Sequence, residues 1–446
     1  MSTRIVVVGG GTAGARLAQR LPVTLLGEEP HAPYNRVLLA DVLAGRYEPE
    51  VIALPAPLEP VRRGVRAVRI DRAARTVECE DGTAVGYDRL VLATGSNPVL
   101  PPLRGLRGSR LPSGVHPFRT LDDCLELRAL VRPGVRAVVI GGGLLGVSAA
   151  RALAALGAEV VLTQQGERLM ERQLDAHASE LLREHVESLG VEVHTECRVS
   201  GLRQEGGAVT AVELADGFVL DAQVVVLACG VRPRIGLARD AGLKVRTGIV
   251  VDDELRTSDP FIHAIGDCAE HDGRVYGLAG PALEQADALA GVLHTQAAVP
   301  SVVGNRSAGA RGVPPDGVWG RVGTTDGALA GASAPGGSVP TTTVPGSARP
   351  HYTGTRALTR LTLGGPVSLD LASFGEATPR PGDDVVQLTD ATRRAYRKVV
   401  VRGDRLVGGV LLGDLAAVGA LARAWEGDEA LPPAPLLHLL THDGGS

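Results

Sequence analysis

The chain has 446 residues, 44% of them hydrophobic and 22% charged, values typical of globular domains that argue against a wholly disordered or membrane-embedded protein. Its 46 basic and 50 acidic side chains give a net charge of −4, so no cationic excess is available to neutralise a nucleic-acid backbone, and we expect no nucleic-acid partner. At roughly 100–200 residues per domain, this length predicts two to four domains.

The apolar segments and the cysteines exclude further classes of protein. The first apolar run, Ile5–Val8, is too short for a signal-peptide core, and no other stretch approaches the roughly 18 apolar residues that a bilayer requires. We therefore expect a soluble, cytoplasmic protein without membrane contact. The cysteines are scattered, with neither a paired nor a metal-ligand spacing, so we expect no redox-active disulfide, no iron–sulfur cluster and no metal site. They are Cys79, Cys124, Cys197, Cys229 and Cys268.

The first predicted unit is a phosphate-binding turn between a strand and a helix. A strand at Ile5–Val8 leads into a GxGxxG motif, and a helix to about Arg20 and a second strand at Val23–Leu26 follow. The three glycines, which allow a tight turn, close approach of a pyrophosphate and helix–sheet packing, are Gly9, Gly11 and Gly14. Glu28 follows the second strand, where a carboxylate can bind ribose hydroxyls; the alternative is an ordinary solvated loop.

A second glycine site follows at the end of another strand. The apolar strand Leu90–Leu92 ends in the small residues Ala93, Thr94 and Gly95. Small residues are expected there if the backbone passes close to a ligand.

The plan of the first unit recurs 132 residues later, counted from Gly9 to Gly141 (141 minus 9). A strand at Ala137–Ile140 leads into a second GxGxxG motif, followed by a helix to about Leu156 and a strand at Glu159–Thr163. Its glycines are Gly141, Gly143 and Gly146. Two such units predict two bound dinucleotides. The alternative, for either unit, is that the glycine-rich turn serves only to pack the helix on the sheet.

The residue after the second strand of this unit bears on the choice between NAD and NADP. Where an NAD-binding unit carries an acid, this sequence has Gln164, with Arg168 and Arg172 after it. A neutral residue near arginines removes the repulsion that excludes a 2′-phosphate, so NADP is admissible. The alternative is that these arginines begin a solvated helix.

Two later features fit a flavin. A strand at Phe261–Ile265 ends in Gly266-Asp267, and a carboxylate at such a strand end can hold a ribityl hydroxyl. Gly280-Pro281 then predicts the start of a helix, whose positive end can face a flavin ring and favour its anionic reduced form.

The composition changes at residues 299–350, where 11 glycines and 7 prolines predict a flexible linker or surface insertion. Beyond it, Ala357–Leu363 and Val367–Leu371 alternate as half-buried strands do. A turn joins Val399–Val401 to Leu406–Leu412 in a predicted hairpin, and a helix at Leu415–Trp425 completes a small α+β unit.

Four markers occur in one order along the chain: the first GxGxxG motif, the turn Ala93-Thr94-Gly95, the second GxGxxG motif and Gly266-Asp267. In this combination the sequence resembles flavoproteins with two dinucleotide-binding domains, the FAD- and NAD(P)-dependent pyridine nucleotide oxidoreductases. Within them it is similar to the reductase module of assimilatory nitrite reductase large subunits. The stretches that carry this similarity are Gly27–His31, Tyr34–Arg36, Gln173–Asp175, Gly230–Pro233 and Leu406–Asp414.

The resemblance implies an α/β fold with two Rossmann-like domains, in which the NAD(P)-binding domain is inserted into the FAD-binding domain, plus a small α+β C-terminal domain. We expect the FAD-binding domain to comprise residues 1–117 and 241–298, and the NAD(P)-binding domain to comprise residues 118–240. The linker or insertion would then occupy residues 299–350, and residues 351–446 would form the C-terminal domain, which is a candidate surface for a homodimer.

The resemblance also implies which residues bind the cofactors. FAD would be held by the first set of glycines, a carboxylate at the adenosine ribose, contacts around the next turns and a carboxylate at the ribityl chain, namely Gly9, Gly11, Gly14, Glu28, Arg36, Thr94, Gly95 and Asp267. The nicotinamide cofactor would be held by Gly141, Gly143 and Gly146, with Gly230 near its path. Gln164 and Arg168 are further candidate contacts because of their position after the second strand of this unit, independently of the resemblance. The flavin would carry the chemistry, so we expect no catalytic side chain.

Two positions depart from the relatives. Ferredoxin-reductase-like enzymes pair a lysine and a glutamate beside the flavin, and this sequence has Asp41 and Ser148 at those places. We expect Asp41 to lack a cationic partner, which would alter the nicotinamide pocket.

The function implied is hydride transfer from NAD(P)H to FAD, followed by electron transfer to a separate redox protein, with nitrate or nitrite reductase as the leading acceptor. Because no cysteine cluster could hold an iron–sulfur centre or a sirohaem, nitrite chemistry itself would occur on another polypeptide. One alternative is a ferredoxin or rubredoxin reductase that serves another oxidase. The other is a non-catalytic FAD-binding scaffold or redox sensor, which the residues Asp41, Ser148 and Gln164 leave open.

Overall fold

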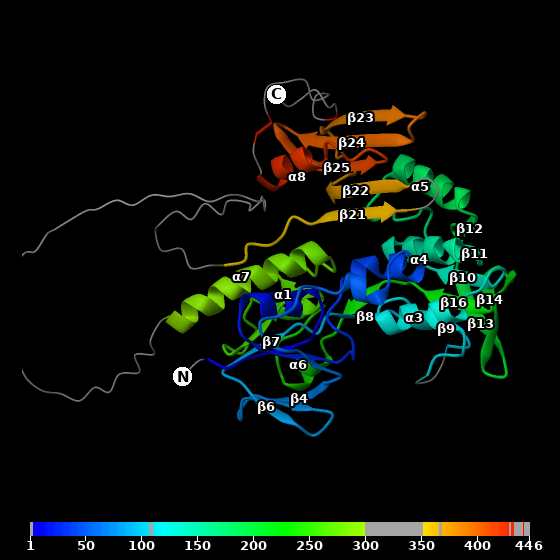
Figure 1. Cartoon of the computed structure of the whole chain (residues 1–446). Helices are drawn as coiled ribbons and strands as arrows, with labels where there is room; N and C mark the ends of the chain where they lie inside the picture. Colours follow the sequence, from blue (N-terminus) through cyan, green and yellow to red (C-terminus); the bar gives the residue numbers. More distant parts are fainter. Residues whose placement is uncertain are drawn as a thin grey trace, which may run out of the picture.

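The computed structural model describes residues 3–106, 110–298, 351–364, 368–427, 430–431 and 440. The insertion predicted at residues 299–350 lies outside the described residues. The described part contains two five-stranded parallel sheets and one five-stranded antiparallel sheet (Figure 1). The predicted α/β class with a small C-terminal α+β unit is therefore confirmed. None of the helices in this part is both long and apolar enough to span a bilayer.

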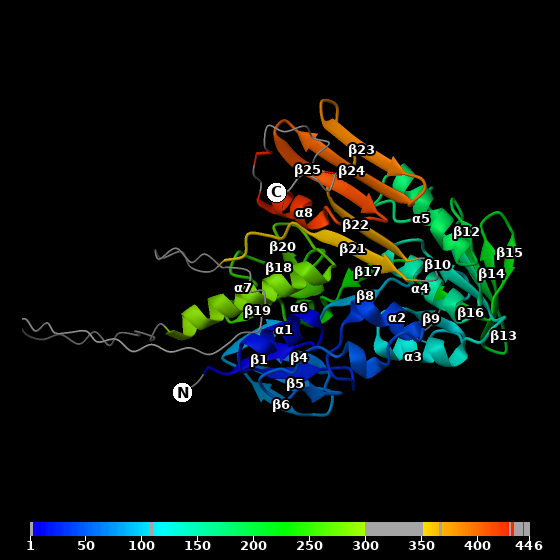
Figure 2. The same cartoon turned by 45° about the horizontal axis from the view of Figure 1, so that its top comes forward.

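The first parallel sheet has the strand order β19-β7-β1-β2-β3 and carries the first glycine turn. Its strands are β1 (Ile5–Val8), β2 (Thr24–Gly27), β3 (Arg62–Arg63), β7 (Arg89–Leu92) and β19 (Ile262–Ala264). Helices α1 (Thr12–Arg20) and α7 (Ala279–Ala298) pack against each other over this sheet (Figure 2). Apart from Arg89 at the start of β7, the strands β1 and β7 consist of aliphatic residues, as expected for a sheet with both faces covered.

The second parallel sheet has the strand order β12-β11-β10-β16-β9 and carries the second glycine turn. Its strands are β9 (Val115–Pro117), β10 (Arg136–Ile140), β11 (Glu159–Thr163), β12 (Val191–His194) and β16 (Val224–Leu227). Its helices are α3 (Leu121–Leu130), α4 (Leu144–Ala155) and α5 (Ala176–Ser188). A small antiparallel sheet shares its core and consists of β13 (Val199–Glu205), β14 (Ala208–Leu214) and β15 (Val219–Asp221). The limits of the predicted domains stay a prediction.

A two-stranded ribbon connects the first two sheets. It pairs β8 (Ser96–Pro98) with β17 (Val231–Pro233) in antiparallel register, so the chain leaves the first sheet and returns to it side by side. The remaining short strands are β4 (Ala67–Asp71), β5 (Thr76–Cys79), β6 (Ala84–Gly86), β18 (Ile249–Val251) and β20 (Ala269–His271). The remaining short helices are α2 (Leu39–Leu43), α6 (Gly236–Asp240), η1 (Arg36–Leu38), η2 (Pro49–Ile52) and η3 (Gly266–Cys268), of which the last three are 3₁₀ helices.

The C-terminal unit is an antiparallel sheet with the order β21-β22-β25-β24-β23 and one helix, drawn in yellow to red in Figure 1. Its elements are β21 (Leu358–Leu363), β22 (Leu369–Gly375), β23 (Asp384–Asp390), β24 (Ala395–Arg402), β25 (Arg405–Leu412) and α8 (Val418–Gly427). The predicted hairpin is confirmed. The predicted helix start at Leu415 is wrong by three residues, because the Asp414 carboxylate accepts the Ala416 N–H at 2.9 Å and holds a turn there.

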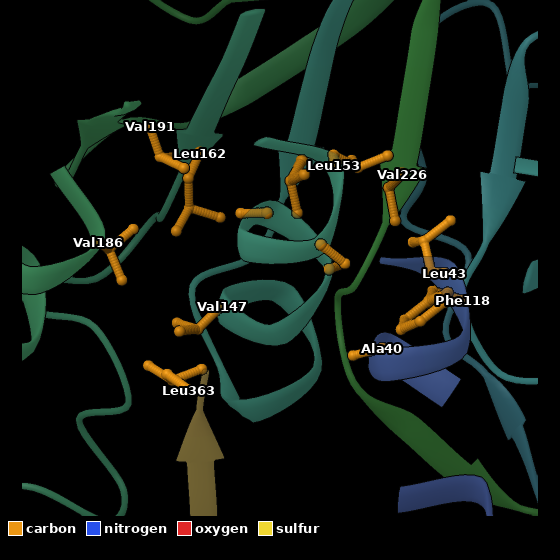
Figure 3. Close-up of a cluster of buried hydrophobic side chains, with 14 of the residues drawn as sticks. Ala40, Leu43, Phe118, Val147, Leu153, Leu162, Val186, Val191, Val226 and Leu363 are labelled. Carbon is orange, nitrogen blue, oxygen red and sulfur yellow. The ribbon is translucent and has the colours of Figure 1, made fainter. Parts of the chain in front are cut away.

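One hydrophobic core joins the second parallel sheet and its helices to the C-terminal sheet and to α2. Figure 3 shows Ala40 and Leu43 of α2, Val147 and Leu153 of α4, and Leu363 of β21 among its buried side chains. The C-terminal sheet is therefore packed onto the helices of the second parallel sheet and is not joined to them by the chain alone. The first parallel sheet has a separate core with α1 and α7.

A buried polar cluster around Asp175 also joins the C-terminal sheet to α5. The Asp175 carboxylate caps α5 by accepting the Ala178 N–H at 3.0 Å, and it accepts the Tyr396 hydroxyl at 2.7 Å and the Lys398 ammonium at 2.9 Å. Lys398 is buried. Burial alone would raise the pKa of Asp175, but the hydrogen bonds from these three groups lower it.

His263 in β19 predicts a pH dependence of stability. Its ring is fully buried, neither ring nitrogen has a partner among the described residues, and burial, assisted by Arg89, lowers its pKa from 6.5 to about 4. In the unfolded chain His263 is therefore protonated near pH 6.5, whereas in the folded chain it is protonated only near pH 4. The free energy of unfolding falls as the pH falls between these two values. Between pH 7.5 and 5.0 this group alone should remove about 2 kcal/mol of unfolding free energy.

Urea unfolding of the wild type and of His263→Leu at both pH values measures this effect. The substitution removes the titrating ring and keeps an apolar side chain, so the variant should lose about 2 kcal/mol less than the wild type between the two pH values. Equal losses in the two proteins would show that His263 does not carry the effect.

Candidate functional site

A cavity of about 1960 Å³ is lined by the carboxyl ends of both parallel sheets. The β8–β17 ribbon, the start of α7 and three residues of β21, namely Thr359, Arg360 and Leu361, complete its wall. Ligands of open parallel sheets bind outside the carboxyl ends of the strands, so this is the expected place for a site. The volume exceeds the roughly 300–1,000 Å³ of an ordinary small-molecule pocket, which leaves room for more than one ligand.

The three glycines of the first turn differ in what surrounds them. Gly9 has φ +117°, and a Cβ there would lie 2.1 Å from the Ala93 carbonyl oxygen; a Cβ on Gly14 would lie 2.0 Å from the Gly9 carbonyl oxygen. A Cβ on Gly11 would meet no protein atom within 4 Å. Gly9 and Gly14 are therefore required by the fold, whereas Gly11 leaves a gap on the cavity wall.

The second turn repeats this arrangement. Gly141 has φ +112°, and its Cβ would lie 2.5 Å from the Ala228 carbonyl oxygen; a Cβ on Gly146 would lie 1.7 Å from the Gly141 carbonyl oxygen. Gly143 is open, with no protein atom within 4 Å of a Cβ, and it lines the same cavity. Gly11 and Gly143 are the N-caps of α1 and α4, and neither helix has a side-chain cap. The first backbone N–H groups of α1 and α4 can therefore bind an anion.

Both acidic residues after β2 are paired with arginines. Glu28, on the cavity wall, accepts two hydrogen bonds from Arg234, which lower its pKa despite partial burial. Glu29 pairs with Arg36 and accepts the Tyr34 hydroxyl at 2.5 Å. Arg234 follows β17 and was missed by the sequence analysis, because nothing in its neighbourhood along the chain signals a partner 206 residues away.

Asp267 also lines the cavity and carries an ion pair. Its carboxylate accepts hydrogen bonds from Arg119 Nη2 at 2.6 Å and from Ser96 Oγ at 2.9 Å. Arg36 donates to the Arg119 carbonyl oxygen at 2.9 Å. The sequence analysis missed Arg119 and Ser96; the available signal was the T-x-x-D capping box beginning at Thr120, which places a helix start directly after Arg119.

The two further glycine turns lead into the ribbon on opposite strands. Gly95 and Gly230 have φ +71° and +95°, and a Cβ added at either position would meet no protein atom within 4 Å. Thr94, beside Gly95, donates its hydroxyl to the Arg234 carbonyl oxygen at 2.7 Å. All of these residues line the cavity.

The polar residues predicted after β11 do not all reach the cavity. Gln164 lines it, but its Oε1 accepts the Gly142 N–H at 2.8 Å, so the side chain is bound to the second glycine turn. Arg172 lines the cavity, and Arg168 does not. Gln164 therefore supports the shape of the turn, and the cofactor contact assigned to Arg168 stays a prediction.

The expectation that Asp41 lacks a cationic partner is wrong. Asp41 in α2 accepts a hydrogen bond from Arg151 Nη2 at 2.8 Å and lies 3.6 Å from Arg46 Nη1. Arg151 is buried in α4, one turn beyond Ser148, and also donates to the Gly364 carbonyl oxygen at 3.1 Å. Ser148 donates to a carbonyl of its own helix. An ion pair thus ties α2 to α4, but neither of its members lines the cavity.

The cysteines do not supply a nucleophile to the cavity. All five are free thiols. Two of them, Cys197 and Cys229, line the cavity; burial raises the pKa of both, that of Cys229 to about 11. Thiols with raised pKa values are poorly ionised at neutral pH.

The pattern that describes the pyridine nucleotide-disulphide oxidoreductase family matches residues 3–286, and that of the rubredoxin NAD⁺ reductase C-terminal domain matches residues 366–426. The chain is 37% identical over 303 residues to the assimilatory nitrate reductase electron transfer subunit of Bacillus subtilis, which covers 64% of this chain and 38% of that protein. It is 33% identical over 452 residues to the nitrite reductase [NAD(P)H] large subunit of Klebsiella oxytoca, and this match covers 97% of this chain and 41% of that protein.

Among solved structures, the putidaredoxin reductase–putidaredoxin complex matches with a TM-score of 0.76 and 23% identity over 98% of both chains. At this identity the match shows the fold alone. The chain spans less than half the length of the first curated relatives that it matches.

Proposed function

Because this chain belongs to the pyridine nucleotide-disulphide oxidoreductase family, we propose that it is an FAD-dependent NAD(P)H oxidoreductase that passes electrons through the flavin to a separate redox protein. Similarity to proteins of nitrate and nitrite reduction favours an acceptor in that process. The observation that supports the proposal most strongly is that both open glycine positions, Gly11 and Gly143, line one cavity. Two dinucleotides bound at these positions would share that cavity.

The residues present fit both cofactors. Each open glycine leaves a gap that a methyl group would fill, and each stands before a helix whose first N–H groups lack a side-chain cap. This combination suits a pyrophosphate, which needs close backbone approach and positive dipole ends. When bound, FAD supplies the redox chemistry that joins a two-electron nicotinamide donor to a one-electron carrier.

In the first unit we assign binding and orientation to the cavity-wall residues. The turn at Gly11 would bind the FAD pyrophosphate and Glu28 the adenosine ribose, with Arg234 keeping Glu28 ionised. Asp267 would hold the ribityl chain while Arg119 fixes its carboxylate. Other FAD contacts would come from Gly9, Gly14, Arg36, Thr94 and Gly95.

In the second unit the chain would position NAD(P)H. The turn at Gly143 would bind its pyrophosphate, Gln164 would keep that turn in shape through the Gly142 N–H, and Gly230 would give the cofactor close passage. The remaining contacts would come from Gly141, Gly146 and Arg168.

The acceptor would approach from the side of the C-terminal sheet, because β21 forms part of the cavity wall. The match of residues 366–426 to the rubredoxin NAD⁺ reductase C-terminal domain favours a second candidate function, that of a rubredoxin or ferredoxin reductase serving another oxidase. We also propose that the protein forms a homodimer through this sheet and that it is located in the cytoplasm.

Anaerobic mixing of the purified protein with NADH and NADPH tests the function. We expect a yellow protein whose visible flavin absorption disappears with at least one of the two nucleotides, and then returns on addition of an acceptor such as a rubredoxin, a ferredoxin or a nitrite reductase. The acceptor that restores the absorption fastest distinguishes the two candidate functions. Absorption that persists with both nucleotides would favour a non-catalytic scaffold, and a colourless protein that takes up no FAD would refute the assignment.

A further inference from the structure

A chain of hydrogen bonds leads from the turn that carries Asp267 to the segment that enters the C-terminal sheet. The Gly266 N–H donates to Gln285 Oε1 at 2.7 Å, and Gln285 Nε2 donates to the Tyr352 hydroxyl oxygen at 3.4 Å. The hydroxyls of Tyr352 and Thr355 lie 2.6 Å apart, and Thr355 donates to Glu284 Oε2 at 2.7 Å. Gln285 is 1% exposed and Tyr352 4%.

The acceptor at the far end fixes the direction of every bond in this chain. The exposed Glu284 carboxylate, when ionised, can only accept, so the Thr355 proton points to it. The Tyr352 proton must then point to Thr355, which leaves a lone pair of Tyr352 for the Gln285 amide. The Gln285 oxygen is thereby turned toward Gly266. Hydrogen bonds aligned in one direction polarise and strengthen one another.

This chain connects two parts of the cavity wall. At one end, Gly266 has φ +77° and is followed by Asp267 on the wall. At the other end, Tyr352 and Thr355 lie just before β21, whose residue Thr359 is also on the wall. Tyr276, another wall residue, accepts the Thr355 N–H at 3.1 Å. The docking of the segment before β21 is therefore coupled to the shape of the Gly266-Asp267 turn.

We propose that Gln285, Tyr352 and Thr355 are positioning residues that hold the Gly266-Asp267 turn for FAD, so that correct docking of the C-terminal segment determines how tightly the flavin is retained. The proposal deepens the proposed function and rests on it. These side chains act through Gly266, whose N–H they hold, and through the Asp267 carboxylate that follows it.

The rate at which FAD leaves the holoprotein tests the proposal, measured as the rise in flavin fluorescence after dilution. The variants are Gln285→Leu, Tyr352→Phe and Thr355→Val, each of which removes hydrogen-bonding groups and nearly keeps the side-chain shape, with Thr355→Ser as the conservative counterpart. Ser373→Ala is the matched control, because it removes a buried hydroxyl that donates to the Gln173 carbonyl oxygen and lines no part of the cavity. Thermal unfolding of each apoprotein is recorded in parallel.

We expect FAD release to be about tenfold faster in the Gln285 and Tyr352 variants, as the loss of about one hydrogen bond implies. Thr355→Ser should release FAD at the wild-type rate and Thr355→Val faster. Ser373→Ala should lower apoprotein stability to a similar extent without speeding release. Unchanged release in the three variants, or equally fast release in Ser373→Ala, would overturn the inference alone. A wild-type protein that binds no FAD would overturn the proposed function together with it.

Discussion

The substitution Gly143→Ala is expected to leave the protein folded and loaded with FAD while lowering kcat/KM for NAD(P)H by about 10²-fold. Gly143 has extended backbone angles, φ −80° and ψ −174°, which alanine also adopts, and an added Cβ would meet no protein atom within 4 Å. The methyl group would instead occupy the gap on the cavity wall that a pyrophosphate needs. Displacement of the cofactor by about 1 Å suffices for a loss of this size.

Stopped-flow reduction of the bound flavin measures this effect, and two companion variants control it. Gly11→Ala makes the same change in the first unit, so it should weaken FAD binding. Gly146→Ala would place a Cβ 1.7 Å from the Gly141 carbonyl oxygen, so it should damage the second unit itself and lower its stability. If Gly143→Ala were reduced at the wild-type rate, the second turn would not be the nicotinamide cofactor site.

The substitution Asp175→Ala is expected to lower the free energy of unfolding by about 3–5 kcal/mol. It leaves the buried Lys398 ammonium without its carboxylate, leaves the Tyr396 hydroxyl without its acceptor, and removes the N-cap of α5. An uncompensated buried charge is the largest of these losses. Urea unfolding followed by circular dichroism measures it.

The double variant Asp175→Ala/Lys398→Met provides the control for this experiment. Because it leaves no unpaired charge at the junction, it should be more stable than Asp175→Ala alone, even though it carries one more substitution. A loss below about 1 kcal/mol for Asp175→Ala, or a double variant whose loss equals the sum of the single losses, would show that the ion pair does not hold the junction.

The elements that sequence reasoning located best are buried parallel strands with local signals. Ile5–Val8 and Glu159–Thr163 have the predicted limits, because each is an apolar run bounded by a glycine turn or a polar residue. Strand β23 was not predicted. It lies at the edge of its sheet, and its side chains are mostly exposed or half-buried, so its sequence lacks a strong apolar pattern.

The charged partners of the site residues could not be predicted from the sequence. The glycine turns could be located because strand, turn and helix are adjacent in sequence. Arg119 reaches Asp267 across 148 positions, Arg234 reaches Glu28 across 206, and Arg151 reaches Asp41 across 110. These pairs depend on how the parts of the chain around the two parallel sheets and the β8–β17 ribbon are placed relative to each other, which neither local propensity nor motif spacing determines.

The β8–β17 ribbon has a consequence for protein engineering. Because Pro98 pairs with Val231, the segment between them begins and ends at one place, as an inserted cassette does. A cassette from another reductase could therefore be grafted at these two residues while β7 and β19 keep their hydrogen bonds, provided that it keeps the surface on which α2 and the C-terminal sheet pack. Because Arg119, which holds the Asp267 carboxylate, lies inside this segment, a grafted cassette has to keep an arginine at that position if nucleotide preference is to be exchanged without loss of the flavin contacts.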